Sequence, residues 1–189
     1  MLFRSETYAS SGSSADDQID GGSLATDVLN AGSLGVGTFA SAVDTPSVSS
    51  LVTVSFTATG RIRSGSHIKL VLSGDQEMSN TPVVSLTQVG GLASVASRNS
   101  IDSASWTSDS KTLLLVTGGS DPIDDSGSVK LTIADVYSAS KVGSGSSIAV
   151  TVYDESGTSD RVVDTGSFVT DAISKGSLAS GGKIGRAHV

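Results

Sequence analysis

Residues 51–72 read LVTVSFTATGRIRSGSHIKLVL and contain two stretches in which apolar side chains alternate with others. A period of two predicts β-strands that each bury one face, because successive side chains of a strand point to opposite sides. The segment 60–66 between them is rich in Gly, Ser and Arg, which predicts a turn region with exposed arginines. The residues expected on the buried faces are Val52, Val54, Phe56, Ile68, Leu70 and Leu72.

The same alternation recurs along the chain, in segments separated by turns of Gly, Ser and Asp. Trp106 and the run 113–116 flank a short Asp/Ser turn, which predicts a β-hairpin with the tryptophan as an apolar anchor. Helical periodicity is nearly absent. Many short strands of this kind predict an all-β fold, an antiparallel immunoglobulin-like β-sandwich. The further strands are expected around 83–86, 129–133, 148–152 and 162–163.

An internal repeat sets the domain organisation. The segment DGGSLATDVLNAGSL at 20–34 returns as DTGSFVTDAISKGSL at 164–178, 144 positions later. Self-similarity at a fixed period is typical of tandem arrays. We therefore predict that 6–30 is the C-terminal end of a preceding repeat, 31–178 a complete β-sandwich repeat, and 179–182 the start of the next.

The residues at the two ends of the chain are expected not to belong to the natural protein. Residues 1–5 (MLFRS) and 183–189 (KIGRAHV) correspond to a common sequencing-library adapter translated in complementary directions. We therefore expect both to be adapter artefacts and exclude them from the fold.

The amino-acid composition of the chain argues against some classes of binding partner. The net charge of −7 argues against nucleic acid and against contact of this segment with an anionic membrane. The chain has no cysteine, so it forms neither disulfides nor thiolate metal sites. Acidity, few lysines and abundant Ser, Thr and Gly favour an extracellular or cell-surface protein.

The residues give little support for catalysis. His67 is the only histidine outside the suspected adapter residues, and no nucleophile-elbow motif accompanies it. The pattern Ser66-His67-Ile68-Lys69 resembles a Ser-x-x-Lys motif, but that motif works on a helix. On a strand, Ser66 and Lys69 point to opposite faces. We therefore expect that this protein is not an enzyme.

Acidic side chains gather in two turn regions and are the candidate metal ligands. Carboxylates at domain junctions can bind calcium and stiffen an array, although none of these has EF-hand or other known calcium-loop spacing. The alternative is that they are ordinary turn residues exposed to water. A glycosidase-type carboxylate pair is a further alternative, without an aromatic-rich cleft beside it. The calcium candidates are Asp121, Asp124, Asp125, Asp154, Glu155, Asp160 and Asp164.

Three segments carry a family resemblance: VTVSFTATGRIRSGSHIKLVLSG, SASWTSDSKTLLLVT and GSSIAVTVYDESGTSDRVVDTGS. Over 31–178 the chain resembles immunoglobulin-like tandem repeats of large secreted or cell-surface microbial proteins. The resemblance implies a structural or adhesive array without enzyme activity, whose partners are neighbouring repeats of the same chain. The alternative is a calcium- or carbohydrate-dependent adhesion module that binds a surface glycan or another surface protein.

Overall fold

The computed structural model describes residues 2–8, 18–25, 30–89, 99–155 and 161–176. The chain divides into two compact units, Met1–Asn30 and Ala31–Val189. Asp160 and the predicted start of a next repeat at 179–182 lie outside the described residues.

The first unit contains a β-hairpin. Strand β1 (Leu2–Tyr8) pairs antiparallel with β2 (Gln18–Ala25), with a register irregularity between Thr7 and Tyr8. Strand β1 therefore includes residues that the sequence interpretation ascribes to the adapter.

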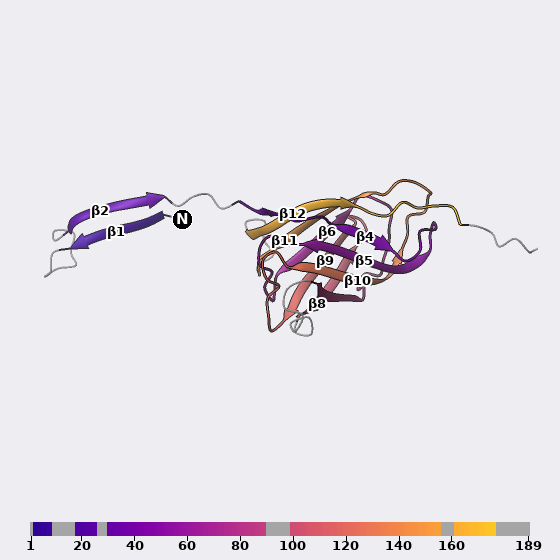
Figure 1. The fold of residues 1–189 in the computed structure, drawn as a ribbon, viewed down its shortest axis with the longest axis horizontal. Helices are drawn as coiled ribbons and strands as arrows, with labels where there is room; N and C mark the ends of the chain where they lie inside the picture. The colour runs from indigo at the N-terminus through magenta and orange to yellow at the C-terminus, as the bar shows by residue number, and fades with distance from the viewer. Residues whose placement is uncertain (1, 9–17, 26–29, 90–98, 156–160, 177–189) are drawn as a thin grey trace, which may run out of the picture. The chain divides into compact units, whose positions relative to one another are not determined.

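The second unit consists of two sheets that pack into a sandwich (Figure 1). Every strand pair in it is antiparallel except β12 with β3, which is parallel. The four-stranded sheet has the order β4 (Thr38–Ser41), β5 (Ser49–Thr57), β10 (Ser128–Tyr137) and β7 (Val84–Val89). The six-stranded sheet has the order β3 (Gly32–Ser33), β12 (Val162–Val169), β11 (Ser147–Tyr153), β6 (His67–Leu72), β9 (Thr112–Gly119) and β8 (Asn99–Thr107).

The strand order is that of an immunoglobulin-like domain. A constant-type immunoglobulin domain has strands A, B, E and D in one sheet and C, F and G in the other. The order β4-β5-β10-β7 matches A-B-E-D, and β6, β11 and β12 take the places of C, F and G. Strands β8 and β9 are an insertion between the D and E equivalents that extends the larger sheet beside β6. The predicted antiparallel immunoglobulin-like β-sandwich is confirmed, and β3, β8 and β9 are additions to the basic seven-stranded plan.

Alternating side chains from both sheets form the core. The buried faces predicted in β5 and β6 are confirmed, since those residues are at most 3% exposed. Burying each such side chain contributes roughly 1.5–3 kcal/mol. Trp106 is 4% exposed and lies in the β8–β9 hairpin, as predicted. Other fully buried residues are Leu113, Leu115, Val129, Leu131, Ile148 and Val152.

The first and the last described residues of the second unit contact the sandwich at opposite ends of β12. At the first end, Gly32 lies opposite Asp164, and the Leu34 N–H donates to the Thr165 carbonyl at 2.8 Å. At the other end, the Ser174 N–H donates to the Asp44 carbonyl at 2.8 Å. We call these the entry end and the exit end. The extended run from Asp164 to Thr170 separates them by about 20 Å at ~3.3 Å per residue.

Candidate functional site

The predicted calcium ligands that the structure describes lie at the entry end, all on loops except Asp164, which is in β12. Asp121, Asp124 and Asp125 are in the loop between β9 and β10, which is held by a bridge between Ile62 and Ile123. Asp154 and Glu155 follow β11. The tertiary structure therefore brings two acidic segments to one end of the sandwich.

Arginines accompany two of these carboxylates. Arg61 Nη2 lies 3.1 Å from Asp124 Oδ1, and Arg161 Nη1 lies 3.9 Å from Asp154 Oδ2. Exposed pairs of this kind contribute at most about 1 kcal/mol. Across the described part of the chain, no three His, Cys, Asp or Glu side chains converge in a way that could hold a metal ion. Calcium binding stays a prediction.

Asp164 is the exception among the candidates because it is 0% exposed. Its Oδ2 accepts hydrogen bonds from the backbone N–H groups of Thr59 and Gly60, both at 2.9 Å. Its Oδ1 has no hydrogen-bond partner in the described structure. Two N–H donors stabilise the carboxylate and join β12 to the loop after β5, which is an anchoring role.

A cavity of about 250 Å³ lies at the same end. Two arginines and two acidic side chains line it, so it presents both signs of charge. Its polar lining residues are Arg61, Arg63, Ser64, Ser120, Asp121 and Glu155.

A second cavity, of about 390 Å³, lies on the outer face of the six-stranded sheet. Strand register places Lys69 opposite Leu114, and Leu114 opposite Ser105. Tyr153 comes from the neighbouring strand β11. Of the lining residues that the structure describes, Lys69 is the only charged one. We call this cavity the hydroxyl basin; its lining is Lys69, Ser105, Thr107, Ser110, Thr112, Leu114 and Tyr153.

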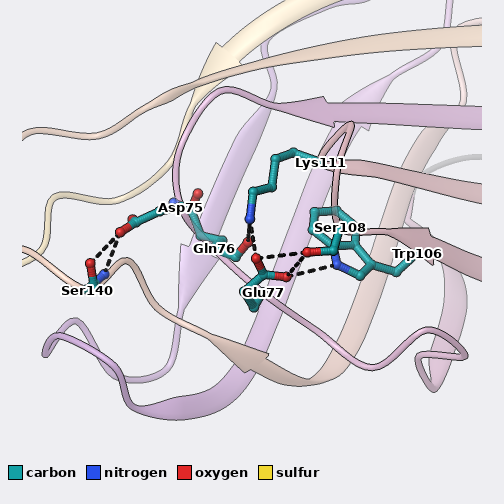
Figure 2. A network of polar contacts seen from close by, with 7 residues as sticks. All are labelled: Asp75, Gln76, Glu77, Trp106, Ser108, Lys111 and Ser140. Atoms are coloured by element: carbon teal, nitrogen blue, oxygen red, sulfur yellow. Dashed lines mark hydrogen bonds and ion pairs between the residues drawn. The ribbon is translucent and has the colours of Figure 1, made fainter.

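Hydrogen bonds and an ion pair to the carboxylate of Glu77 hold the segment between β6 and β7 against the β8–β9 hairpin, as Figure 2 shows. Glu77 accepts hydrogen bonds from Trp106 Nε1 at 3.2 Å and from Ser108 Oγ at 2.8 Å. Lys111 Nζ pairs with the same carboxylate and donates to the Gln76 carbonyl at 3.4 Å. The hydrogen bond from Lys111 is the main cause that lowers the pKa of Glu77, with Ser108 and Trp106 adding to it against the opposing effect of burial. Glu77 therefore ties this segment to the β8–β9 hairpin.

Asp75 ties the same segment to the loop between β10 and β11 (Figure 2). It accepts hydrogen bonds from the backbone N–H of Ser140, at 3.1 Å, and from the Ser140 hydroxyl. The hydroxyl bond is the largest cause that lowers the Asp75 pKa. Both carboxylates stabilise a long connection between the sheets.

Two further carboxylates meet at the exit end. Asp171 Oδ2 accepts a hydrogen bond from the Ser41 N–H at 2.8 Å. Asp44 Oδ1 is buried without a partner in the described structure. Burial first, and repulsion from Asp171 second, raise the pKa of Asp44.

The Ser-x-x-Lys pattern does not form a catalytic pair. Ser66 is 1% exposed and its Oγ accepts a hydrogen bond from the Arg63 N–H at 3.1 Å. Lys69 lines the basin on the outer face. The two side chains point to opposite sides of the sheet, as predicted for a strand.

Sequence reasoning did not identify Lys69, Glu77 or Asp75 as site residues. Their partners come from distant segments: Ser140 is 65 residues from Asp75, and Lys111 is 34 residues from Glu77. The only local signal was the position of Lys69 on the polar face of an alternating strand.

No protein-family model matches the chain, and no curated protein matches it. Solved structures of similar arrangement include the collagen-binding domain of a Staphylococcus aureus adhesin. It shares 8% identity at a TM-score of 0.40, over 71% of this chain and 95% of that one. A cohesin–dockerin complex from Clostridium thermocellum shares 10% identity at a TM-score of 0.38, over 77% of this chain and 99% of the other.

A third similar structure is AvmM, which catalyses macrocyclization in alchivemycin A biosynthesis. It shares 10% identity at a TM-score of 0.34, over 77% of this chain and 91% of AvmM. Binding proteins and an enzyme thus occur together among these likenesses, and at such scores none assigns a function. None of the described segments forms a helix with the length and apolarity that crossing a bilayer requires.

Proposed function

We propose that this chain is a non-catalytic repeat of a long extracellular or cell-surface protein, in which each immunoglobulin-like sandwich acts as a structural and adhesive unit. The observation that carries this proposal is the position of the chain ends of the sandwich. The chain enters beside Asp164 and leaves beyond Thr170, at opposite ends of β12. Copies joined in this way extend an array instead of folding back on themselves.

The strand boundaries support a tandem arrangement. Strand β2 spans Gln18–Ala25 and β12 spans Val162–Val169, so the two eight-residue strands lie 144 positions apart, the spacing of the sequence repeat. Gly32 begins β3, and its counterpart in the repeat is Gly176. Ser174 is still hydrogen-bonded to the sandwich. If Gly176 docks on the next copy as Gly32 docks on this one, Lys175 alone separates the contacts of the two copies, although the sequence repeat itself extends to residue 178. A linker of one residue limits the bending between neighbouring copies.

Small-angle X-ray scattering tests this proposal. One, then two, further copies of residues 31–174 are inserted after residue 174 of the full chain. We expect the maximum dimension to grow by an equal increment with each copy. A matched control with five Gly and Ser residues inserted at each junction between copies, directly after Ser174, should broaden the distance distribution. A maximum dimension that stays nearly constant as copies are added would contradict the array.

A calcium-dependent form of this function is the second candidate. It is favoured by the acidic segments that meet at the entry end, around Asp121–Asp125 and Asp154–Glu155. Thermal unfolding with calcium and with a chelator distinguishes the two forms. A midpoint several degrees higher in calcium supports an ion site. An unchanged, cooperative transition leaves a calcium-independent spacer.

A further inference from the structure

We propose that the hydroxyl basin binds an acidic oligosaccharide, a glycan that carries carboxylate or sulfate groups. This inference rests on the proposed adhesive function and names the ligand class and the site.

The basin spans four neighbouring strands, from β11 through β6 and β9 to β8 at the end of the sheet. Lys69 pairs in register with Leu114 on one side and with Thr151 on the other. Tyr153 lies two residues beyond Thr151 on the same face, which makes it a diagonal neighbour of Lys69. The basin runs from Tyr153 along β9 to Ser110 in the turn of the β8–β9 hairpin. It is therefore elongated along the strands and suits a chain-like ligand.

The lining suits a sugar better than an extended peptide. Strands β6, β9 and β11 are each paired on both sides, so their backbones offer no free edge for an added strand. Strand β8 ends the sheet, but its Trp106 N–H already donates to the Asn80 carbonyl at 3.0 Å. Leu114 is the only aliphatic residue of the lining. Hydroxyl groups both donate and accept hydrogen bonds, which matches the hydroxyls of a sugar. The hydroxyl side chains are Ser105, Thr107, Ser110 and Thr112, of which Thr112 already donates to the Ser110 carbonyl at 3.1 Å.

Tyr153 gives the basin an aromatic wall. The ring of a half-buried tyrosine combines an apolar body with a polar tip, and such side chains are common in binding sites. Trp106, by contrast, is buried in the core and is not part of this surface.

The positive charge of Lys69 favours an acidic ligand. Among the described residues of the lining, Lys69 alone has a charged side chain, and it makes no ion pair with another described residue. The whole chain has a net charge of −7, which disfavours general binding of polyanions. An acidic glycan is therefore expected to bind at this local cation, where the ammonium group can donate to a carboxylate or a sulfate.

Nuclear magnetic resonance titration of the full 189-residue chain tests the proposal. The probes are trigalacturonic acid for carboxylates, a κ-carrageenan tetrasaccharide, which carries sulfates and no carboxylate, for sulfates, and the fully methylated ester of trigalacturonic acid as the neutral counterpart. We expect amide shifts confined to β6, β8, β9, β11 and the β8–β9 turn with at least one acidic probe. The probe that binds more tightly distinguishes carboxylate from sulfate.

Variants of Lys69 provide the specificity control. We expect Lys69→Gln to weaken binding by roughly tenfold to a hundredfold, as for the loss of a charge-assisted hydrogen bond. Lys69→Arg should retain most of the affinity. Lys130→Gln, at an exposed lysine of β10 in the other sheet, should leave the affinity within about twofold, because exposed distant charges are screened. An unchanged unfolding midpoint shows that each variant is folded.

Three results would overturn the proposal: no binding of either acidic probe, equal binding of the methyl ester, or equal losses in Lys69→Gln and Lys130→Gln. None of them affects the scattering series, because the growth of the array does not depend on Lys69. A failed ligand and a failed array are therefore separate outcomes.

Discussion

The carboxylate of Asp164 occupies the space where a side chain at residue 32 would begin. A Cβ atom placed on Gly32 would lie 2.1 Å from Asp164 Oδ1, well inside the distance that real Cβ contacts show. Asp164 and Gly32 are also register partners in the parallel pair of β12 and β3. The strand that enters the sandwich can therefore dock on β12 only because residue 32 has no side chain.

The first prediction concerns this close approach. We expect Gly32→Ala to destabilise the sandwich by about 1–3 kcal/mol, the usual cost of forcing extra atoms into a packed site. Denaturant unfolding measures the change. Gly143→Ala is the matched control, since a Cβ at that position would meet nothing within 4 Å, and its unfolding free energy should be nearly unchanged. Equal effects of the two substitutions would contradict the docking interpretation.

The Asp164 carboxylate itself gives the second prediction. Asp164→Ala leaves the N–H groups of Thr59 and Gly60 without their acceptor, and we expect a loss of roughly 2–4 kcal/mol in unfolding free energy. Asp125→Ala, at an exposed loop position, is the control and should change stability by less than about 0.5 kcal/mol. If Asp164→Ala unfolds at the same denaturant concentration as the parent chain, the anchoring role is wrong.

The lowered pKa of Glu77 predicts that the sandwich loses stability in acid. This pKa is lowered from the ordinary value of 4.5, so the folded state favours the ionised form. The resulting stabilisation is present above the unfolded-state pKa and disappears as the pH falls through the folded-state pKa. We expect Glu77→Gln to have the lower unfolding midpoint at pH 7, and the difference from the parent chain to shrink below about pH 4.5.

Thermal unfolding at several pH values between 7 and 3 checks this expectation. Asp109→Asn, at an exposed turn residue, serves as the control and should follow the parent chain closely. A difference between Glu77→Gln and the parent that stays constant with pH would show that the ionised form of Glu77 adds no stability.

The raised pKa of Asp44 predicts a change in stability with pH in the opposite direction from that of Glu77. The pKa of Asp44 is raised above 3.8 by burial and by the neighbouring Asp171, so the ionised form is disfavoured in the folded state. The parent chain therefore gains stability from this site as the pH falls through the raised pKa toward 3.8. Asp44→Asn cannot ionise, and we expect it to unfold at a higher temperature than the parent chain at pH 7.

The same pH series measures the Asp44 effect. The advantage of Asp44→Asn should decrease as the parent carboxyl is protonated, while the deficit of Glu77→Gln also decreases. Asp44→Asn with a lower midpoint than the parent at pH 7 would be the contrary result, and would mean that the charged Asp44 has a stabilising partner.

The sequence by itself determined the fold class and the buried faces. The alternation in 51–57 and 67–72 predicted strands and their inner residues correctly, because side-chain direction along a strand is a local property with a period of two. The separation of Ser66 and Lys69 onto opposite faces followed from the same rule. The 144-residue spacing of the internal repeat was likewise evident from the sequence alone.

Only the tertiary structure decided which strands are neighbours and which polar residues meet. Strands β8 and β9 extend the larger sheet beside β6, a choice that depends on contacts between distant segments. Asp164 was indistinguishable in sequence from the acidic turn residues, because its hydrogen-bond donors lie 104 and 105 positions away. Lys69 and Tyr153 likewise share one basin because β6 and β11 pair, and that pairing is set by burial of the common core rather than by any local motif.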